Sequence, residues 1–129
     1  MGHTMPPTYP RPLVPMLRVE DADGSAGFYT ELLGFTITEK LEEDGRLVWA
    51  RLESGAAELM LTEQPGEVET SPGAGAILYV YVEDVEALHA SLAEQGVTVG
   101  ELRRTEYGIT EFELVDPDGY ELWFGQPAG

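Results

Sequence analysis

The chain has 129 residues, no cysteine, and 24 Asp and Glu against 7 Lys and Arg, which gives a formal net charge of -17. This composition excludes disulfides and thiol catalysis, and its negative charge disfavours nucleic acids and anionic membranes as partners. Because no run of about 18 apolar residues is present, we expect a cytoplasmic protein of one domain that buries roughly two-thirds of its accessible surface.

The first eleven residues are predicted to be a flexible tail. They lack the basic segment followed by an apolar segment that marks a secretory signal. Met5 is an alternative native start, with the preceding residues as an expression remnant.

From Leu13 onward the sequence contains the same order of predicted elements twice. An apolar strand over 13–19 leads to Asp21, and a similar strand over 76–82 leads to Asp84. The period of two predicts that one face of each strand lies in the core. The residues on those faces are Leu13, Pro15, Leu17, Val19, Ala76, Leu78, Val80 and Val82.

Each strand is followed by a short helix, predicted over 24–33 and 85–95 from apolar residues at helical spacing. Asp21 and Asp84 occupy the N-cap positions, and Gly34 and Gly96 are where the helices must end.

Three strands then follow each helix, predicted over 35–41, 47–53 and 57–62, and again over 97–105, 109–115 and 120–125. The chain therefore reads as two βαβββ modules, at 12–63 and 76–126, joined by a linker rich in Pro and Gly at 64–75.

Several of these segments together resemble the vicinal-oxygen-chelate superfamily, which contains glyoxalase I, extradiol dioxygenases, fosfomycin-resistance enzymes and bleomycin-resistance proteins. They are the strand before Asp21, Phe28-Tyr29, Leu32-Leu33-Gly34-Phe35, Tyr107-Gly108, Phe112 and Asp116-Pro117-Asp118-Gly119. The resemblance implies an α+β fold over 12–126, in which two tandem βαβββ modules form a U-shaped trough of mixed sheet.

In metal-dependent members of that superfamily, a His or Glu projects into the trough from the first and last strand of each module. Aligning the two repeats places Val14, Met60, Ile77 and Trp123 in these positions. Hydrocarbon, thioether and indole side chains do not suit the metals used there. The resemblance thus narrows to the metal-free bleomycin-resistance branch, which implies no cofactor, no metal site and no catalytic residue.

A shift of two residues is an alternative alignment. It brings Glu58 and Glu121 into the last-strand positions without turning any core residue outward.

The pleat predicts an aromatic and aliphatic trough lining with a few charges, which suits a flat, partly cationic organic ligand. The candidate ligand-binding residues are Met16, Trp49, Arg51, Glu58, Met60, Tyr79, Tyr81, Tyr107, Glu121 and Trp123. Tyr79, Tyr81 and Trp123 are alternatively dimer-interface or core residues.

Two further residue groups have structural alternatives. Glu58 and Glu121 alternatively pair with Arg18 and Arg51. The segment from Asp116 to Gly119 is interpreted as a turn and nothing more.

The first function hypothesis is a drug-binding protein of antibiotic resistance. In this hypothesis a homodimer sequesters a cationic or aromatic small molecule, with Pro15 in a first strand exchanged between subunits as the resemblance implies. An edge-strand proline is the alternative role for Pro15.

The second hypothesis is a glyoxalase-like or dioxygenase-like enzyme, a lyase, isomerase or dioxygenase. It would use an atypical metal site, or Glu121 or Glu58 as a general base. A structural or regulatory dimer with a degenerate pocket is a third reading. The unsuitable side chains in the metal positions favour the first hypothesis.

Overall fold

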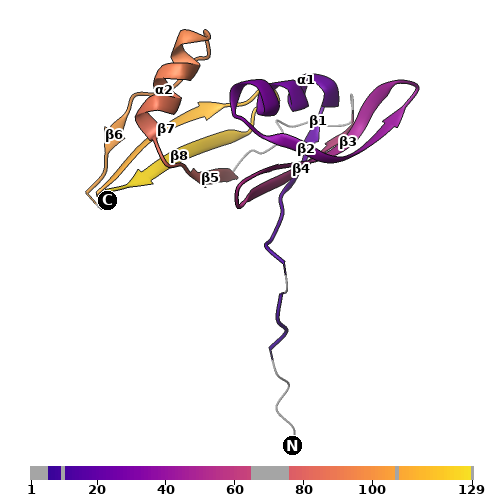
Figure 1. The fold of residues 1–129 in the computed structure, drawn as a ribbon, viewed down its shortest axis with the longest axis horizontal. Helices are drawn as coiled ribbons and strands as arrows, with labels where there is room; N and C mark the ends of the chain where they lie inside the picture. The colour runs from indigo at the N-terminus through magenta and orange to yellow at the C-terminus, as the bar shows by residue number, and fades with distance from the viewer. Residues whose placement is uncertain (1–5, 10, 65–75, 107, 129) are drawn as a thin grey trace, which may run out of the picture.

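The computed structural model describes residues 6–9, 11–64, 76–106 and 108–128. The predicted linker, apart from Gln64, and the candidate ligand residue Tyr107 lie outside them. Two four-stranded sheets follow one another along the chain, and Figure 1 shows the helices α1 and α2 on the same side of them. In the part of the chain that is described, no helix has the length and apolar character needed to cross a bilayer.

The first module contains β1 (Met16–Val19), α1 (Ala22–Gly27), the π-helical turn η1 (Phe28–Leu32), β2 (Thr36–Glu43), β3 (Arg46–Ser54) and β4 (Ala57–Glu63). Its strands form sheet A in the order β1-β4-β3-β2. The strand β1 is parallel to β4, whereas the other pairs are antiparallel.

The second module contains β5 (Ile77–Tyr81), α2 (Val85–Glu94), β6 (Arg103–Arg104), β7 (Ile109–Val115) and β8 (Glu121–Pro127). Sheet B has the equivalent order β5-β8-β7-β6, with β5 parallel to β8. The predicted α+β fold of tandem βαβββ modules is thereby confirmed.

The two sheets repeat one another in register. Met16 pairs with Met60 in sheet A, and Tyr79 pairs with Trp123 in sheet B. Each residue of the first pair lies 63 positions before its counterpart in the second. Equivalent residues of the two modules can therefore be compared one by one.

The core lies between the sheets and their helices. In β1 the buried residues Leu17 and Val19 alternate with exposed ones, and in β8 Leu122 and Phe124 face the core. This confirms the predicted core face of the first strand from Leu17 onward, but Leu13 is 91% exposed. The reason is that β1 begins only at Met16, so Leu13 precedes the sheet.

The helix predicted over 24–33 differs from the observed one at its start and in its last turn. It begins at Ala22, because a Glu63 carboxylate oxygen on β4 accepts a hydrogen bond from the Ala22 amide at 2.9 Å. It continues into η1, where the Phe35 amide donates to the Tyr29 carbonyl at 3.0 Å. The predicted end is correct, since Gly34 has a φ of 79° that other residues rarely adopt.

The strand predicted over 97–105 was too long. The Val97 amide still donates to the Leu92 carbonyl of α2. The chain first meets β7 where the Gly100 amide donates to the Glu113 carbonyl, and only Arg103 and Arg104 pair as the strand β6.

The segment after β7 joins the two modules, so its interpretation as a simple turn was incomplete. The Tyr29 hydroxyl donates to Asp116 at 2.6 Å, and the Ser25 hydroxyl donates to Asp118. The Tyr120 hydroxyl accepts from the Arg18 amide at 3.0 Å and donates to the Arg18 carbonyl at 2.9 Å. We call this contact of the β7–β8 turn with β1 and α1 the first junction.

Candidate functional site

Each sheet has an open face on the side opposite its helix. On β1 this face carries Met16 and Arg18, which are exposed, and on β8 it carries Glu121 and Trp123, which are half-buried. The two open faces hold most of the predicted ligand-binding residues. They are the surfaces on which the site is built.

On sheet A the open face centres on an ion-pair network. The Arg51 guanidinium on β3 contacts Glu39 on the neighbouring strand β2 at 3.2 Å, and it also contacts Glu58 on the other neighbouring strand, β4. The hydrogen bond to Glu58 raises the pKa of Arg51 above its usual value. Because both carboxylates are satisfied by one cation, this half offers a ligand mainly the apolar side chains beside it, Met16 and Met60.

On sheet B the open face forms an aromatic and acidic surface, which we call the platform. Its members are Tyr79, Arg103, Glu111, Glu113, Glu121 and Trp123. The Arg103 guanidinium carbon lies 5.0 Å from the Trp123 ring centroid, within the range of a cation–π contact. The same guanidinium binds Glu113 at 2.7 Å and lies 4.0 Å from Glu111.

The Tyr79 ring lies across the platform because the strand beneath it has a glycine. A Cβ atom at Gly125 would stand 2.1 Å from the Tyr79 hydroxyl, so any larger residue would displace the ring. The hydroxyl donates to Glu111 at 2.8 Å. Burial, and then this hydrogen bond, raise the pKa of Tyr79 to about 12, so it remains a hydrogen-bond donor at neutral pH.

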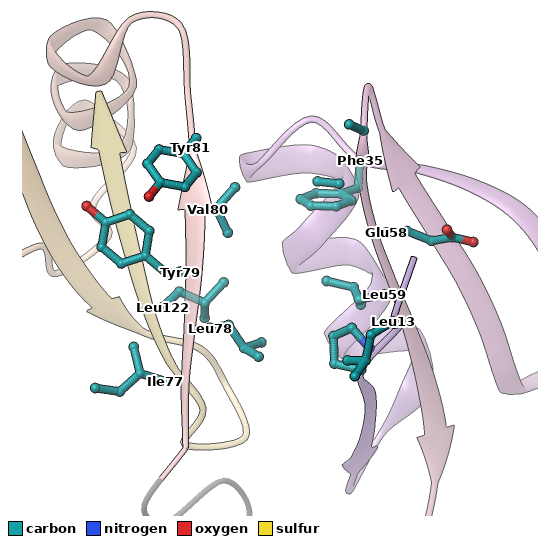
Figure 2. Close-up of a pocket in the computed structure, with 13 residues that line it drawn as sticks. Leu13, Phe35, Glu58, Leu59, Ile77, Leu78, Tyr79, Val80, Tyr81 and Leu122 are labelled. Carbon is teal, nitrogen blue, oxygen red and sulfur yellow. The ribbon is translucent and has the colours of Figure 1, made fainter. Parts of the chain in front are cut away.

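A cleft of about 430 Å³ separates the two modules between β5 and the β1–β4 pair. Figure 2 shows Leu78 and Val80 pointing from β5 toward Phe35, Leu59 and Leu13 across the gap. The predicted residues Glu58, Tyr79 and Tyr81 line its rim, with the Glu58 carboxylate turned away from the gap. The cleft is thus apolar inside and polar at its edge.

The structure divides the predicted ligand residues between the two sheets. Met16, Trp49, Arg51, Glu58 and Met60 lie on sheet A, and Tyr79, Tyr81, Glu121 and Trp123 lie on sheet B. Of the alternatives for the carboxylates, the ion pair between Glu58 and Arg51 is present. Glu121 instead accepts a hydrogen bond from the Trp123 indole at 2.8 Å.

Sequence reasoning missed three members of the platform and most of the cleft. Glu111 and Glu113 alternate with the buried Phe112 and Leu114 on β7. This period-two pattern was a signal that they share a face with Trp123. Arg103 gave no comparable signal, because its place over the indole depends on the pairing of β6 with β7.

The four positions aligned with metal ligands carry no suitable donor set. In the observed register Ile77 pairs with Glu121 on β8, and Trp123 pairs with Tyr79. The Glu121 carboxylate is therefore the group beside the hydrocarbon side chain of Ile77. Glu58 and Glu121 are both engaged by neighbours. Within the described residues no three His, Asp or Glu side chains are placed to hold a metal ion, so the fit to a divalent ion is poor.

Comparisons with known proteins agree with this fold. A family model described as "Glyoxalase/Bleomycin resistance protein/Dioxygenase superfamily" matches residues 2–124. A search of curated proteins finds no match.

Solved structures give three informative likenesses. TioX from Micromonospora sp. ML1 has a TM-score of 0.76 and 21% identity, over 90% of this chain and 98% of that chain. TnmS3, an antibiotic binding protein from Streptomyces sp. CB03234, has a TM-score of 0.70 and 25% identity, over 94% and 100%. A bleomycin resistance determinant encoded on the transposon Tn5 has a TM-score of 0.70 and 23% identity, over 92% and 98%.

Proposed function

Because the chain belongs to the Glyoxalase/Bleomycin resistance protein/Dioxygenase superfamily, we propose that it binds a flat, cationic or aromatic small molecule and leaves it chemically unchanged. The antibiotic-binding and bleomycin-resistance proteins among its structural neighbours support this role. The platform on sheet B is the proposed binding surface.

One observation carries this proposal, namely that the platform already holds a cation of its own chain. The Arg103 guanidinium, which is flat and positively charged, lies over Trp123 and is bound by Glu113. Indole faces attract such cations through the ring quadrupole, and carboxylates add charge-assisted hydrogen bonds. A ligand guanidinium, amine or heteroaromatic cation would bind the same groups by displacing the Arg103 side chain, which is 42% exposed.

The net charge and the cleft support the same reading. With a net charge of -17 the protein raises the concentration of cationic molecules near its surface. The apolar interior of the cleft between the modules offers burial for an uncharged part of the ligand beside the platform. We further propose that a second subunit faces the open sheets and completes each site.

Bleomycin is the probe for the test. Melting the protein with bleomycin at about 100 times its dissociation constant should add about 2.7 kcal/mol of stability. Trp123→Ala should weaken binding by about 1–3 kcal/mol, because stacking and cation–π contacts are lost together. Glu113→Gln should also weaken binding, whereas Glu86→Gln on the exposed side of α2 is the matched control for one lost charge.

Binding is measured by calorimetry, and the melting temperature without ligand shows whether each variant folds. Equal affinity of wild type and the folded Trp123→Ala variant would contradict the platform as the site. Stabilisation by Zn, Ni, Mn or Fe salts without any response to bleomycin would instead favour an enzyme of the superfamily.

A further inference from the structure

The repeat predicts a second junction between the modules. This second junction differs from the first in the side chains that the turn places in it. Counting 63 positions back along β8, Tyr120 corresponds to Ala57, and the residues Gly55 and Ala56 stand in place of the segment around Asp118. In the first junction Tyr120 and Asp118 reach across to β1 and α1. In the second junction the β3–β4 turn faces β5 and α2 across a cavity, with only Gly55, Ala56 and the methyl group of Ala57 in their places.

A cavity of about 370 Å³ lies at this second junction. Its lining includes Ala57, Tyr81 and Leu88, which correspond to Tyr120, Arg18 and Ser25 of the first junction. The turn is also one residue shorter here, since the paired residues Glu53 and Glu58 are separated by four residues, whereas the equivalent pair Val115 and Glu121 is separated by five. The cavity thus occupies the space that the side chains of the β7–β8 turn fill in the other half.

Backbone groups at the cavity match those that Tyr120 uses. The strands β1 and β5 are both at the edges of their sheets, where alternate residues direct their N–H and C=O groups outward. At Arg18 the Tyr120 hydroxyl takes both outward groups. Tyr81 is the equivalent residue on β5, and the methyl group of Ala57 can neither donate to nor accept from it.

We propose that the second junction binds a phenolic small molecule. Its hydroxyl takes the position that the Tyr120 hydroxyl has in the first junction, between the N–H and C=O groups of Tyr81. Its ring packs among apolar residues of the cavity, including Leu88 and Phe124. This site goes beyond the proposed function, because it uses none of the platform residues, although it adjoins the cleft and shares Phe35, Ala57 and Tyr81 with the lining of the cleft.

The test uses p-cresol, which reproduces a tyrosine side chain. Titration into the full-length protein, followed by NMR, should give intermolecular NOEs between the ring and the methyl groups of Leu88. Toluene has the same ring without the hydroxyl, so it should bind at least about tenfold more weakly, because both hydrogen bonds of the hydroxyl are lost and the backbone groups stay unpaired.

Two variants separate this site from the platform. Ala57→Tyr supplies the missing side chain and should abolish p-cresol binding, whereas Trp123→Ala should leave it unchanged. Absence of NOEs to Leu88 in the wild type would overturn the proposal, whether or not Ala57→Tyr folds. This is the result expected if a second copy fills the cavity. Equal affinity for toluene, or loss of binding only in Trp123→Ala, would overturn it as well.

Discussion

Asp116 is one of two buried polar or charged residues among those described, with 4% of its surface exposed. Its carboxylate accepts hydrogen bonds from the Tyr29 hydroxyl and from the amides of Asp118 and Tyr120. Burial nevertheless dominates these bonds and raises the pKa of Asp116 above its ordinary value. In the first junction the ionised form of Asp116 is therefore less favourable than it is in the unfolded chain, which costs stability.

This cost gives a pH dependence with a definite sign. A raised pKa in the folded state means that the native protein binds the proton more tightly than the unfolded chain does. The unfolding free energy of wild type, relative to Asp116→Asn, should therefore rise as the pH falls from 7 through the raised pKa. It should level off below the unfolded value of about 3.9. Denaturant titrations between pH 3 and 7 measure it, and a difference that is flat or falls on acidification contradicts the assignment.

At the scale of the element, the two helices occupy equivalent places but begin in different ways. Asp84 caps α2 with its own side chain, accepting from the Ala87 amide at 3.0 Å. Asp21 stands at the same position before α1 but makes no such bond. There the capping acceptor is Glu63 on β4, which also pairs with Arg46 at 2.7 Å. The start of α1 thus depends on sheet A, whereas the start of α2 is local.

The difference predicts unequal effects of the same substitution. Asp84→Ala should destabilise the protein by about 1 kcal/mol, the usual cost of losing an N-cap acceptor. Asp21→Ala is the matched variant and should cost less than half as much, because no side-chain cap is lost. Urea denaturation followed by circular dichroism measures both, and equal losses would show that the observed cap does not decide the stability.

At the scale of the whole molecule, the described part of the segment before β1, residues 6–9 and 11–15, leaves the body of the protein. Figure 1 shows it running away from both sheets, on the side opposite the helices. Tyr9 and Leu13 on this segment are 81% and 91% exposed. Met16 and Ile77 on the open faces are also exposed. These exposed apolar side chains are the surface that the proposed second subunit would cover.

Shortening this segment tests the proposed homodimer. Deletion of residues 1–11 should weaken self-association by at least about tenfold, because apolar contacts worth about 1.4 kcal/mol or more are removed. Sedimentation velocity over a range of concentrations measures the dissociation constant, and the far-ultraviolet circular dichroism should not change. An unchanged constant, or a full-length protein that is monomeric at every concentration, contradicts the prediction. High salt should favour the dimer by screening the net charge of -17.

The sequence by itself determined the two βαβββ modules and much of their core. Periods of two and 3.6 are local properties, so strands such as β3 and β4 and the helix α2 follow from residues close together in the chain. The capping position of Asp84 and the helix end at Gly34 were predictable for the same reason. The face of each strand also follows, which is why half of the platform residues, namely Tyr79, Glu121 and Trp123, were identified.

Only the tertiary structure decided how these pieces meet. The place of Arg103 over Trp123, the role of Asp116 in joining the modules and the cavity beside Ala57 all depend on residues far apart in the chain. Each is an outcome of how the modules pack and which edge strands are left uncovered. No local period encodes such contacts, since their energy exists only once the sheets and helices have been brought together.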